Sequence, residues 1–179
     1  MSKPDTNYRS YADVSNILLC DDRIVPPTKL YDDTLKLSHV DRFLGVRLYV
    51  VGGRENAVDM NRQCQSVVFD DCTFESGDHC AVVIKGGSSD ISLKQCLIYS
   101  HHSSYDIELG GWSDQCMDRT RRVSLEYVRR SDGEPVRIVV GWADAPHCLG
   151  EKCRILFWRS LGLKLFCLGR FLAKKIFGQ

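Results

Sequence analysis

Several common functional signatures are missing from this sequence. Among its 179 residues there is no run of about 20 uncharged apolar residues, which excludes an ordinary transmembrane helix. No Walker loop, Gly-x-Gly-x-x-Gly, His-Glu-x-x-His or Gly-x-Ser-x-Gly motif occurs, so the common nucleotide, zinc-protease and serine-hydrolase sites are not indicated. The nine cysteines are odd in number and contain no Cys-x-x-Cys pair, which argues against a disulfide framework and a standard zinc site.

The N-terminus also lacks the apolar stretch of a secretory signal peptide, because residues 1–16 are largely polar. We therefore expect synthesis in the cytoplasm, where the cysteines stay reduced and act as small apolar side chains. The closeness of His147, Cys148 and Cys153 leaves zinc as an alternative, but their spacing fits no standard ligand pattern and no fourth ligand is evident. We expect no metal and no cofactor.

Charge is small overall but unevenly distributed. The formal net charge is +1, which argues against nucleic acid as a partner. From residue 151 onward there are seven basic residues and one acid, a net of +6, whereas the other 150 residues carry 17 basic and 22 acidic side chains, a net of −5. A mildly acidic body with a basic tail indicates two roles or two partners.

The main positive feature is an internal repeat with an offset of 24 residues, in which residues 66–87 align without a gap on residues 90–111. The alignment places Val67 on Ile91, Phe69 on Leu93, Cys72 on Cys96, Phe74 on Ile98, Ser76 on Ser100, Val83 on Ile107 and Gly86-Gly87 on Gly110-Gly111. Residues 121–142 form a third copy that keeps Val123, Leu125, Val128, Ile138, Val140 and Gly141. The stretch 46–53 matches the strand that precedes the glycine pair.

Each copy contains short runs of Val, Ile, Phe and Leu separated by Asp, Ser, Gly or Gln, a pattern typical of strands joined by turns. A unit of about 24 residues cannot bury its own apolar face, so it must stack on its neighbours. We predict an all-β fold, a short parallel β-helix of three to four coils over residues 46–150. An N-terminal arm or cap (1–45) precedes it, and an amphipathic helix (151–179) follows. Residues 54–65 and 112–120 are predicted insertions, and a chance duplication within a β-sandwich is the alternative.

Strand alternation predicts which side chains face the interior. Tyr49, Val83, Ile107 and Ile138 are expected to form an inward row, and Leu48, Val50, Val82, Ile84 and Val139 an apolar outward stripe. Such a stripe needs cover, either from the chain itself or from another subunit. The first glycine of each copy, at positions 52, 86, 110 and 141, is expected at a corner where φ is positive or a side chain would collide.

The run Val-Val-Phe-Asp-Asp-Cys-Thr-Phe-Glu-Ser, followed by a strand and Gly-Gly, resembles the coils of right-handed parallel β-helix proteins, the pectin-lyase-like group. Segment 55–62 is similar to one that precedes such coils in small phage-type members. The resemblance implies a right-handed solenoid. For function it implies either polysaccharide cleavage or a passive role such as that of bacteriophage spikes and tail fibres, because this fold supports both.

The resemblance also implies where a site would lie, since members that act on polysaccharides carry acids and bases on the outer face of one sheet. The catalytic candidates are Asp106, Glu108, His101 and His102, the two histidines lying in a turn expected beside Asp78 and His79. The binding candidates are Glu55, Asp59, Arg62 and Lys85. For each, a solvated side chain is the competing interpretation. Three coils would give a sheet only about 15 Å tall, which argues against a polymer-cleaving enzyme.

Both open ends of a short solenoid need caps. Residues 17–19, with Leu35 and Leu37, are the predicted N-terminal cap. In the tail, a helical periodicity places basic residues opposite a row of leucines, which fits a cap, a membrane-surface helix or a subunit contact. The contact candidates are Trp158, Arg159, Lys164, Arg170, Lys174 and Lys175.

We therefore expect a non-enzymatic structural or interaction protein that docks on protein subunits through its β-helix and basic tail, for which the resemblance favours a virion component. The alternative is a small β-helix that binds or cleaves a glycan, as a lyase or glycoside hydrolase.

Overall fold

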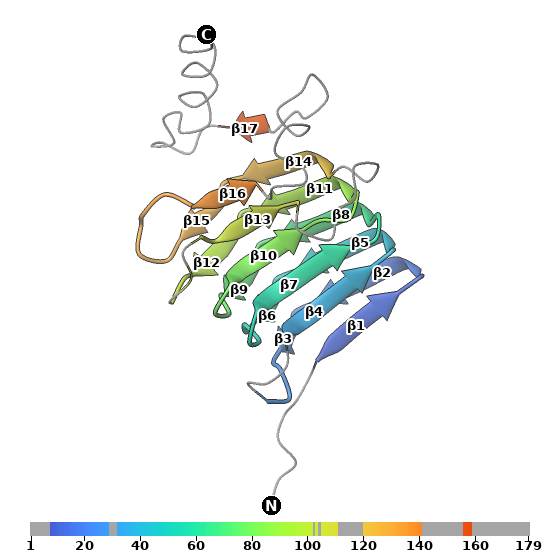
Figure 1. Ribbon diagram of the computed structural model, residues 1–179, viewed down its shortest axis with the longest axis horizontal. Coiled ribbons are helices and arrows are strands. Elements are labelled where there is room, and N and C mark those ends of the chain that lie inside the picture. The colour runs from blue at the N-terminus through green and yellow to red at the C-terminus, as the bar shows by residue number, and fades with distance from the viewer. Residues whose placement is uncertain are drawn as a thin grey trace, which may run out of the picture.

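The computed structural model describes residues 8–28, 32–101, 103, 105–110 and 120–140, and the backbone of residues 156–158. These residues form an all-β solenoid of the right-handed type, in which successive strands visit three sheets in turn (Figure 1). Each strand pairs in parallel with its equivalents in the neighbouring coils, as the registers of β8 on β5 and on β11 illustrate. The predicted stacked parallel architecture is confirmed.

Sheet A contains β1 (Arg9–Ala12), β4 (Asp33–Ser38), β7 (Asn56–Asn61), β10 (Cys80–Ile84), β13 (Ile107–Leu109) and β16 (Ile138–Val140). Sheet B contains β2 (Ser15–Cys20), β5 (Asp41–Val46), β8 (Gln65–Asp70), β11 (Ser89–Lys94), β14 (Arg121–Glu126) and β17 (Leu156–Trp158). Sheet C contains the shorter strands β3 (Arg23–Ile24), β6 (Tyr49–Val50), β9 (Thr73–Glu75), β12 (Leu97–Tyr99) and β15 (Arg129–Arg130).

The predicted register is confirmed in sheets B and C. Strand β11 lies on β8 with Ile91 beside Val67 and Leu93 beside Phe69, an offset of 24 residues. In sheet C, β12 lies on β9 with the same offset. The next coil follows the predicted pattern too, since Val123 and Leu125 lie beside Ile91 and Leu93.

Sheet A departs from the prediction by one residue. Val82, not Val83, lies beside Ile107, because the turn after β12 is one residue longer than the turn after β9. Val82 and Ile84 therefore belong to the interior cluster, whereas Val83 lies on the outer face beside Glu108. The predicted inward position of Val83 is wrong, and so are the predicted outward positions of Val82 and Ile84. Ile107 does point inward.

The stretch 46–53 also belongs to a different sheet from the one predicted. Tyr49 lies beside Thr73 in sheet C, with Leu48 and Val50 buried in the core on either side of it. The strand of sheet A in that coil is β7, which lies within the predicted insertion 54–65. The repeat matched 46–53 through its glycine pair, but β7 is the true equivalent of β10.

The N-terminal segment is part of the solenoid. Strands β1 to β5 pair in parallel with each other and with later strands of the same three sheets. The solenoid therefore extends to residue 9 instead of beginning at the predicted boundary at residue 46. Because these early coils differ in sequence from the repeat, alignment on the glycine pairs did not detect them.

The corner between sheets B and C is built without glycine. A residue with φ between +50° and +56° stands there in five successive coils, at Asp21, Arg47, Asp71, Gln95 and Tyr127. In the first four of these residues the backbone N–H donates to a carbonyl of the next coil, as from Asp71 to Lys94 at 3.0 Å. This bond helps to offset the cost of the left-handed conformation for residues with a Cβ atom.

The predicted glycine corners hold at Gly86 (φ +65°) and Gly110 (φ +72°). Gly52 is required for a different reason, because a Cβ atom there would lie 2.4 Å from the backbone nitrogen of Gly77 in the next coil. This is the predicted collision, although Gly52 follows a strand of sheet C and not of sheet A.

Aromatic side chains of successive coils pack together inside the solenoid. The ring centroid of Phe69 lies 5.2 Å from that of Phe43 and 5.4 Å from that of Phe74. Gly45 lies beside Phe69 in the adjacent strand, where a Cβ atom would approach the Phe69 ring to 2.9 Å. The small residue therefore makes the space that the large neighbour fills.

The predicted C-terminal amphipathic helix lies outside the described residues, apart from the backbone of 156–158, which pairs with β14. Arg159, Lys164, Arg170, Lys174 and Lys175 belong to the same undescribed segment, as do His147, Cys148 and Cys153.

Candidate functional site

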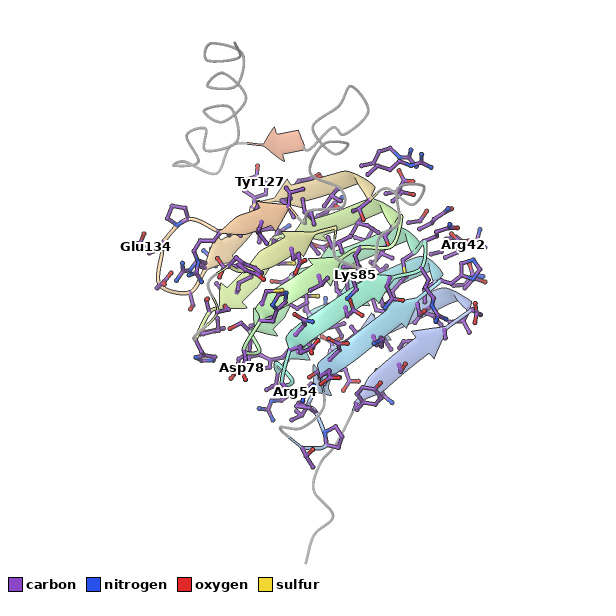
Figure 2. All side chains as sticks on the ribbon, viewed as in Figure 1. Arg42, Arg54, Asp78, Lys85, Tyr127 and Glu134 are labelled. Atoms are coloured by element: carbon purple, nitrogen blue, oxygen red, sulfur yellow. The ribbon has the colours of Figure 1, made fainter. Side chains whose placement is uncertain are left out.

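The outer face of sheet A carries a row of four side chains, three of them charged. Lys36, Asp59, Val83 and Glu108 lie beside one another on four consecutive strands, from β4 to β13. Strand alternation explains their common direction, since each is flanked by residues that point into the core. Lys85 follows β10 on the same face and is labelled in Figure 2. Asp59, Val83 and Glu108 are nevertheless buried, whereas Lys36 and Lys85 are 40% and 26% exposed.

Asp59 is held by two lysines. Its carboxylate lies 2.9 Å from Lys85 Nζ and 3.6 Å from Lys36 Nζ, and it accepts a hydrogen bond of 2.8 Å from Asn61 Nδ2. Burial alone would lower the pKa of Lys85, but the charge of Asp59 outweighs it and the pKa is raised. Asp59 and Lys85, two of the four binding candidates, are therefore in contact, whereas Lys36 was not a candidate.

A second buried acid extends this cluster. Asp33 lies 3.2 Å from Lys36 Nζ and accepts a hydrogen bond of 2.8 Å from Asn56 Nδ2. Cys80 Sγ donates in turn to the amide oxygen of Asn56 at 3.2 Å. Burial, assisted by the charge of Glu108, raises the pKa of the Cys80 thiol, so this cysteine stays protonated. Two acids and two lysines thus neutralise one another, which indicates an ion-pair network that joins coils.

Glu108 forms a separate group with His79 of the neighbouring coil and Tyr105 of its own coil. Its Oε2 lies 2.5 Å from His79 Nε2, and the Tyr105 hydroxyl lies 3.1 Å from His79 Nδ1. Burial, followed by the charge of Glu108, raises the pKa of Tyr105. A carboxylate that orients a partly exposed imidazole can position it for proton exchange. His79 is predicted beside His101 and His102, but it contacts Glu108 and Tyr105.

Asp106, the other acid predicted to face outward, is fully buried. It accepts hydrogen bonds from the backbone N–H and the guanidinium of Arg137, at 2.7 Å and 2.9 Å. Burial would raise the pKa of this carboxyl, but the hydrogen bonds from Arg137 and Ser100 hold it below its usual value. Asp106 therefore ties two coils together, and its carboxylate is already saturated by these donors.

His101 contacts Glu75, which sequence reasoning had not singled out. His101 Nε2 lies 3.1 Å from Glu75 Oε1, and the Tyr49 hydroxyl donates to Glu75 Oε2 at 3.0 Å. Glu75 follows the register of sheet C, with Tyr99 beside it. His102 lies outside the described residues.

The remaining binding candidates are apart from the charge cluster. Glu55 is an exposed side chain next to Arg54, and Arg62 is exposed at the corner that follows β7. Arg62 has a φ of +52°, so its place in the fold is a left-handed corner. Of the four predicted binding residues, only Asp59 and Lys85 are brought together.

A shallow groove crosses the corner between sheets A and B in the N-terminal half of the solenoid. Its volume is about 330 Å³, and its lining comes from three successive coils. His39 Nδ1 lies 2.8 Å from Asp13 Oδ1 at this corner. The lining residues are Asp13, Val14, Ser15, His39, Val40, Asp41, Gln63 and Gln65. None of them was a sequence-based candidate.

The outer face of sheet B carries exposed apolar side chains on adjacent strands. Leu18 on β2 is 62% exposed, Leu44 beside it on β5 is 39% exposed, and Val68 on β8 continues the row. Cys20 and Val46 form a second row on the same face, in register with each other. We call these five residues the apolar face. The predicted stripe is therefore wrong, because Leu48, Val50, Val82 and Ile84 are buried, and the exposed apolar residues lie on a different sheet.

Polar residues replace this apolar face in the later coils. Ser92 lies beside Val68, and Ser124 lies beside Ser92, on β11 and β14. The apolar face is therefore confined to the first coils of sheet B.

Comparison of the chain with models of known protein families, with curated proteins and with solved structures gives no match. The fold is thus established as a parallel solenoid by its strand pairing, whereas membership of the pectin-lyase-like group stays a hypothesis. Within the described ranges, no helix is long and apolar enough to cross a membrane. The same residues include no cluster of three or more His, Cys, Asp or Glu side chains that could hold a metal ion.

Proposed function

We propose that this protein is a non-enzymatic interaction protein that docks on protein subunits of a larger assembly through the outer face of sheet B. The observation that carries the proposal is the apolar face, where Leu18 and Leu44 stand exposed side by side on adjacent strands. A contiguous exposed apolar patch on a sheet is typical of a protein–protein contact. The virion role and the phage-type relation are part of the proposal, and the resemblance of the coils supports them.

The polar clusters support this proposal because their carboxylates already form ion pairs with side chains of the same chain. Asp33 and Asp59 are paired with lysines, Asp106 with Arg137, and Glu108 with His79. Carboxylates held in this way stabilise the contacts between coils, and a substrate would have to displace their partners. These groups therefore favour a structural role over a pair of acid and base catalysts.

Cross-linking mass spectrometry on the native assembly tests the proposal. We expect intermolecular cross-links to start from lysine or acidic residues that border the apolar face, such as Asp21 and Asp41. A matched region is the polar half of sheet B around Ser92, where cross-links to other subunits should be few. Intermolecular cross-links confined to other faces, or a monomer with none, would contradict the proposed docking surface.

A second candidate function is glycan binding, and the groove at the corner of sheets A and B favours it. Its side chains include a paired histidine and aspartate, two glutamines and a further aspartate, which are groups that hydrogen-bond well to hydroxyls. Titration of neutral and acidic oligosaccharides by NMR tests this function. Saturable shifts at Gln63 and Gln65 that vanish in Gln65→Ala would support it, and shifts that stay unsaturated and unaffected by the substitution would exclude it.

A further inference from the structure

Two buried cysteines lie one above the other at the corner between sheets B and C. Strands β9 and β12 pair in parallel with Thr73 beside Leu97, and Cys72 and Cys96 directly precede these two residues. The pairing continues there, since the backbone N–H of Leu97 donates to the carbonyl of Cys72 at 2.9 Å. Both cysteines are free thiols, and their side chains are hydrogen-bonded to each other. The two sulfur atoms are therefore neighbours, although 24 positions separate them in the sequence.

Packing alone does not require sulfur at these two levels of the core. Cys72 and Cys96 are 1% and 0% exposed, and the same column holds Leu48 in the coil before them and Val128 in the coil after them. Aliphatic side chains thus fit this column at neighbouring levels. Two thiols in direct contact differ from aliphatic residues in one chemical property, which is that they can be oxidised to a disulfide.

The register suits such a bond. Adjacent strands lie about 4.8 Å apart, which is within the range of roughly 4.4 to 6.8 Å between the Cα atoms of disulfide-bonded cysteines. The hydrogen bond from the Cys96 thiol lowers the pKa of Cys72 although burial opposes it, and the backbone N–H of Leu48 adds to the effect. The same hydrogen bond and burial raise the pKa of Cys96. Cys72 is therefore the sulfur that reacts first as a thiolate, and Cys96 is the thiol that follows.

We propose that Cys72 and Cys96 are a redox modification site, which a peroxide converts into a disulfide that joins two coils of the solenoid. The Cys72 thiolate attacks one peroxide oxygen and becomes a sulfenic acid, and the other oxygen leaves as hydroxide, which is protonated to water. The sulfur of Cys96 then attacks the sulfur of Cys72, the S–S bond forms, and the sulfenic oxygen leaves as a second water that carries the Cys96 proton. The two thiols lose two electrons, and the peroxide gains them. This site does not depend on the apolar face or on docking.

Two other buried cysteines serve as internal controls. Cys64 stands between Val40 and Ser88 at the same position of the adjacent coils, and Cys80 lies beside Asn56. Neither position repeats a cysteine. Burial raises the pKa of both thiols, so we expect them to resist oxidation.

Peptide mapping of the full chain after treatment with hydrogen peroxide tests the proposal. Hydrogen peroxide is the probe because a small oxidant can reach a buried sulfur through local opening of a coil. Free thiols are then alkylated in denaturant, and cleavage before aspartate gives each of the four buried cysteines of the described residues a peptide of its own. We expect peptide 71–77 to become linked to peptide 90–105 and to be released by dithiothreitol, whereas Cys64 and Cys80 stay alkylated.

Urea unfolding gives an independent readout. The disulfide should raise the folding equilibrium constant of the oxidised chain by about tenfold or more, because it closes a loop of 24 positions in the unfolded chain. Cys96→Val, which introduces the residue that Val128 supplies in the next coil, should abolish this gain. Cys96→Ala replaces it if valine does not fit. Cys64→Ser is the matched control and should keep the full gain.

Three outcomes overturn the proposal. One is that Cys72 and Cys96 stay alkylated like Cys64 after peroxide treatment of the folded chain. Another is that the link forms only in denaturant, because the fold would then not hold the two sulfurs together. The third is that Cys72 links to a different cysteine, or is oxidised to sulfinic acid without linking. None of these outcomes affects the proposed docking role, which the cross-links of the native assembly test separately.

Discussion

Asp106 illustrates how a buried charge can be mistaken for a reactive one. Its position next to a strand predicted an outward carboxylate, but it lies fully buried against Arg137. A buried charge is costly unless it is paired and hydrogen-bonded, and this one is both. Removing one partner leaves the other uncompensated, so the pair should matter for folding.

We predict that Asp106→Asn lowers the free energy of unfolding at neutral pH by about 2 kcal/mol, less than for a fully buried pair because Arg137 keeps some contact with solvent. In the wild type the pKa of Asp106 is lower in the folded than in the unfolded state. The stabilisation is therefore fully present above the unfolded pKa of about 3.9 and is lost as the pH falls through the folded value. Urea titrations from pH 7 down to pH 3 measure both effects.

Asp71→Asn is the control for this prediction, because Asp71 is an exposed corner residue and asparagine also tolerates a positive φ. It should unfold like the wild type at neutral pH. Equal stability of Asp106→Asn and the wild type at pH 7, or a stability difference that persists unchanged at pH 3, would contradict a structural role for the pair.

The sequence identified individual candidates but not their contacts. Asp59 and Lys85 were both binding candidates, whereas Lys36 was not, because it lies in an early coil that shares no glycine pair with the repeat. Glu75 was missed because its partners Tyr49 and His101 come from the preceding and following coils. Such contacts depend on register, which local sequence does not show.

At the scale of strands, the register was predictable where one face is buried and the other is not. In β8 and β11, apolar residues alternate with exposed or partly exposed ones, so the offset of 24 could be read directly. In β10 all five residues are buried, so alternation carries no information and the extra residue before β13 went undetected. The left-handed corner between sheets B and C was also invisible, since Arg47, Gln95 and Tyr127 are not typical of a positive φ.

The aromatic packing between coils gives a prediction at this scale. Phe69 is fully buried between Phe43 and Phe74, and truncating it would leave a cavity that the stacked strands cannot close. We expect Phe69→Ala to lower the free energy of unfolding by about 3–5 kcal/mol. Phe69→Leu, which keeps most of the volume, should cost clearly less. Urea denaturation measures both variants, and a similar loss in the two would show that the site does not pack as described.

At the scale of the whole molecule, the main difference from the sequence-based prediction is the height of the solenoid. Six strands in sheet A, spaced about 4.8 Å apart, give a stack about 24 Å tall instead of the 15 Å expected from three coils. The size argument against a long ligand site is therefore weaker than the sequence indicated. The case for an interaction protein depends on the engaged acids and the apolar face, not on length.

The basic tail yields a prediction from charge alone. Residues 159–179 contain five basic and no acidic side chains, and they lie beyond the last described strand. Deleting them should leave the solenoid folded and should reduce co-sedimentation with vesicles containing anionic lipid. Vesicles of neutral lipid are the control. Undiminished binding of the shortened chain to anionic vesicles would exclude the tail as a membrane anchor.

The account as a whole requires that successive coils lie in parallel register, including across the insertion before β14. Ser92 and Ser124 lie beside each other on the outer face of sheet B, although 32 residues separate them. Adjacent strands about 4.8 Å apart allow a disulfide, whereas a shift of two residues takes the Cα atoms beyond its reach of about 7 Å. Disulfide mapping of Ser92→Cys/Ser124→Cys after mild oxidation is predicted to find the two peptides linked, with no link in Ser92→Cys/Glu126→Cys. Linkage in the second variant but not in the first would contradict the register on which the fold and both proposed surfaces depend.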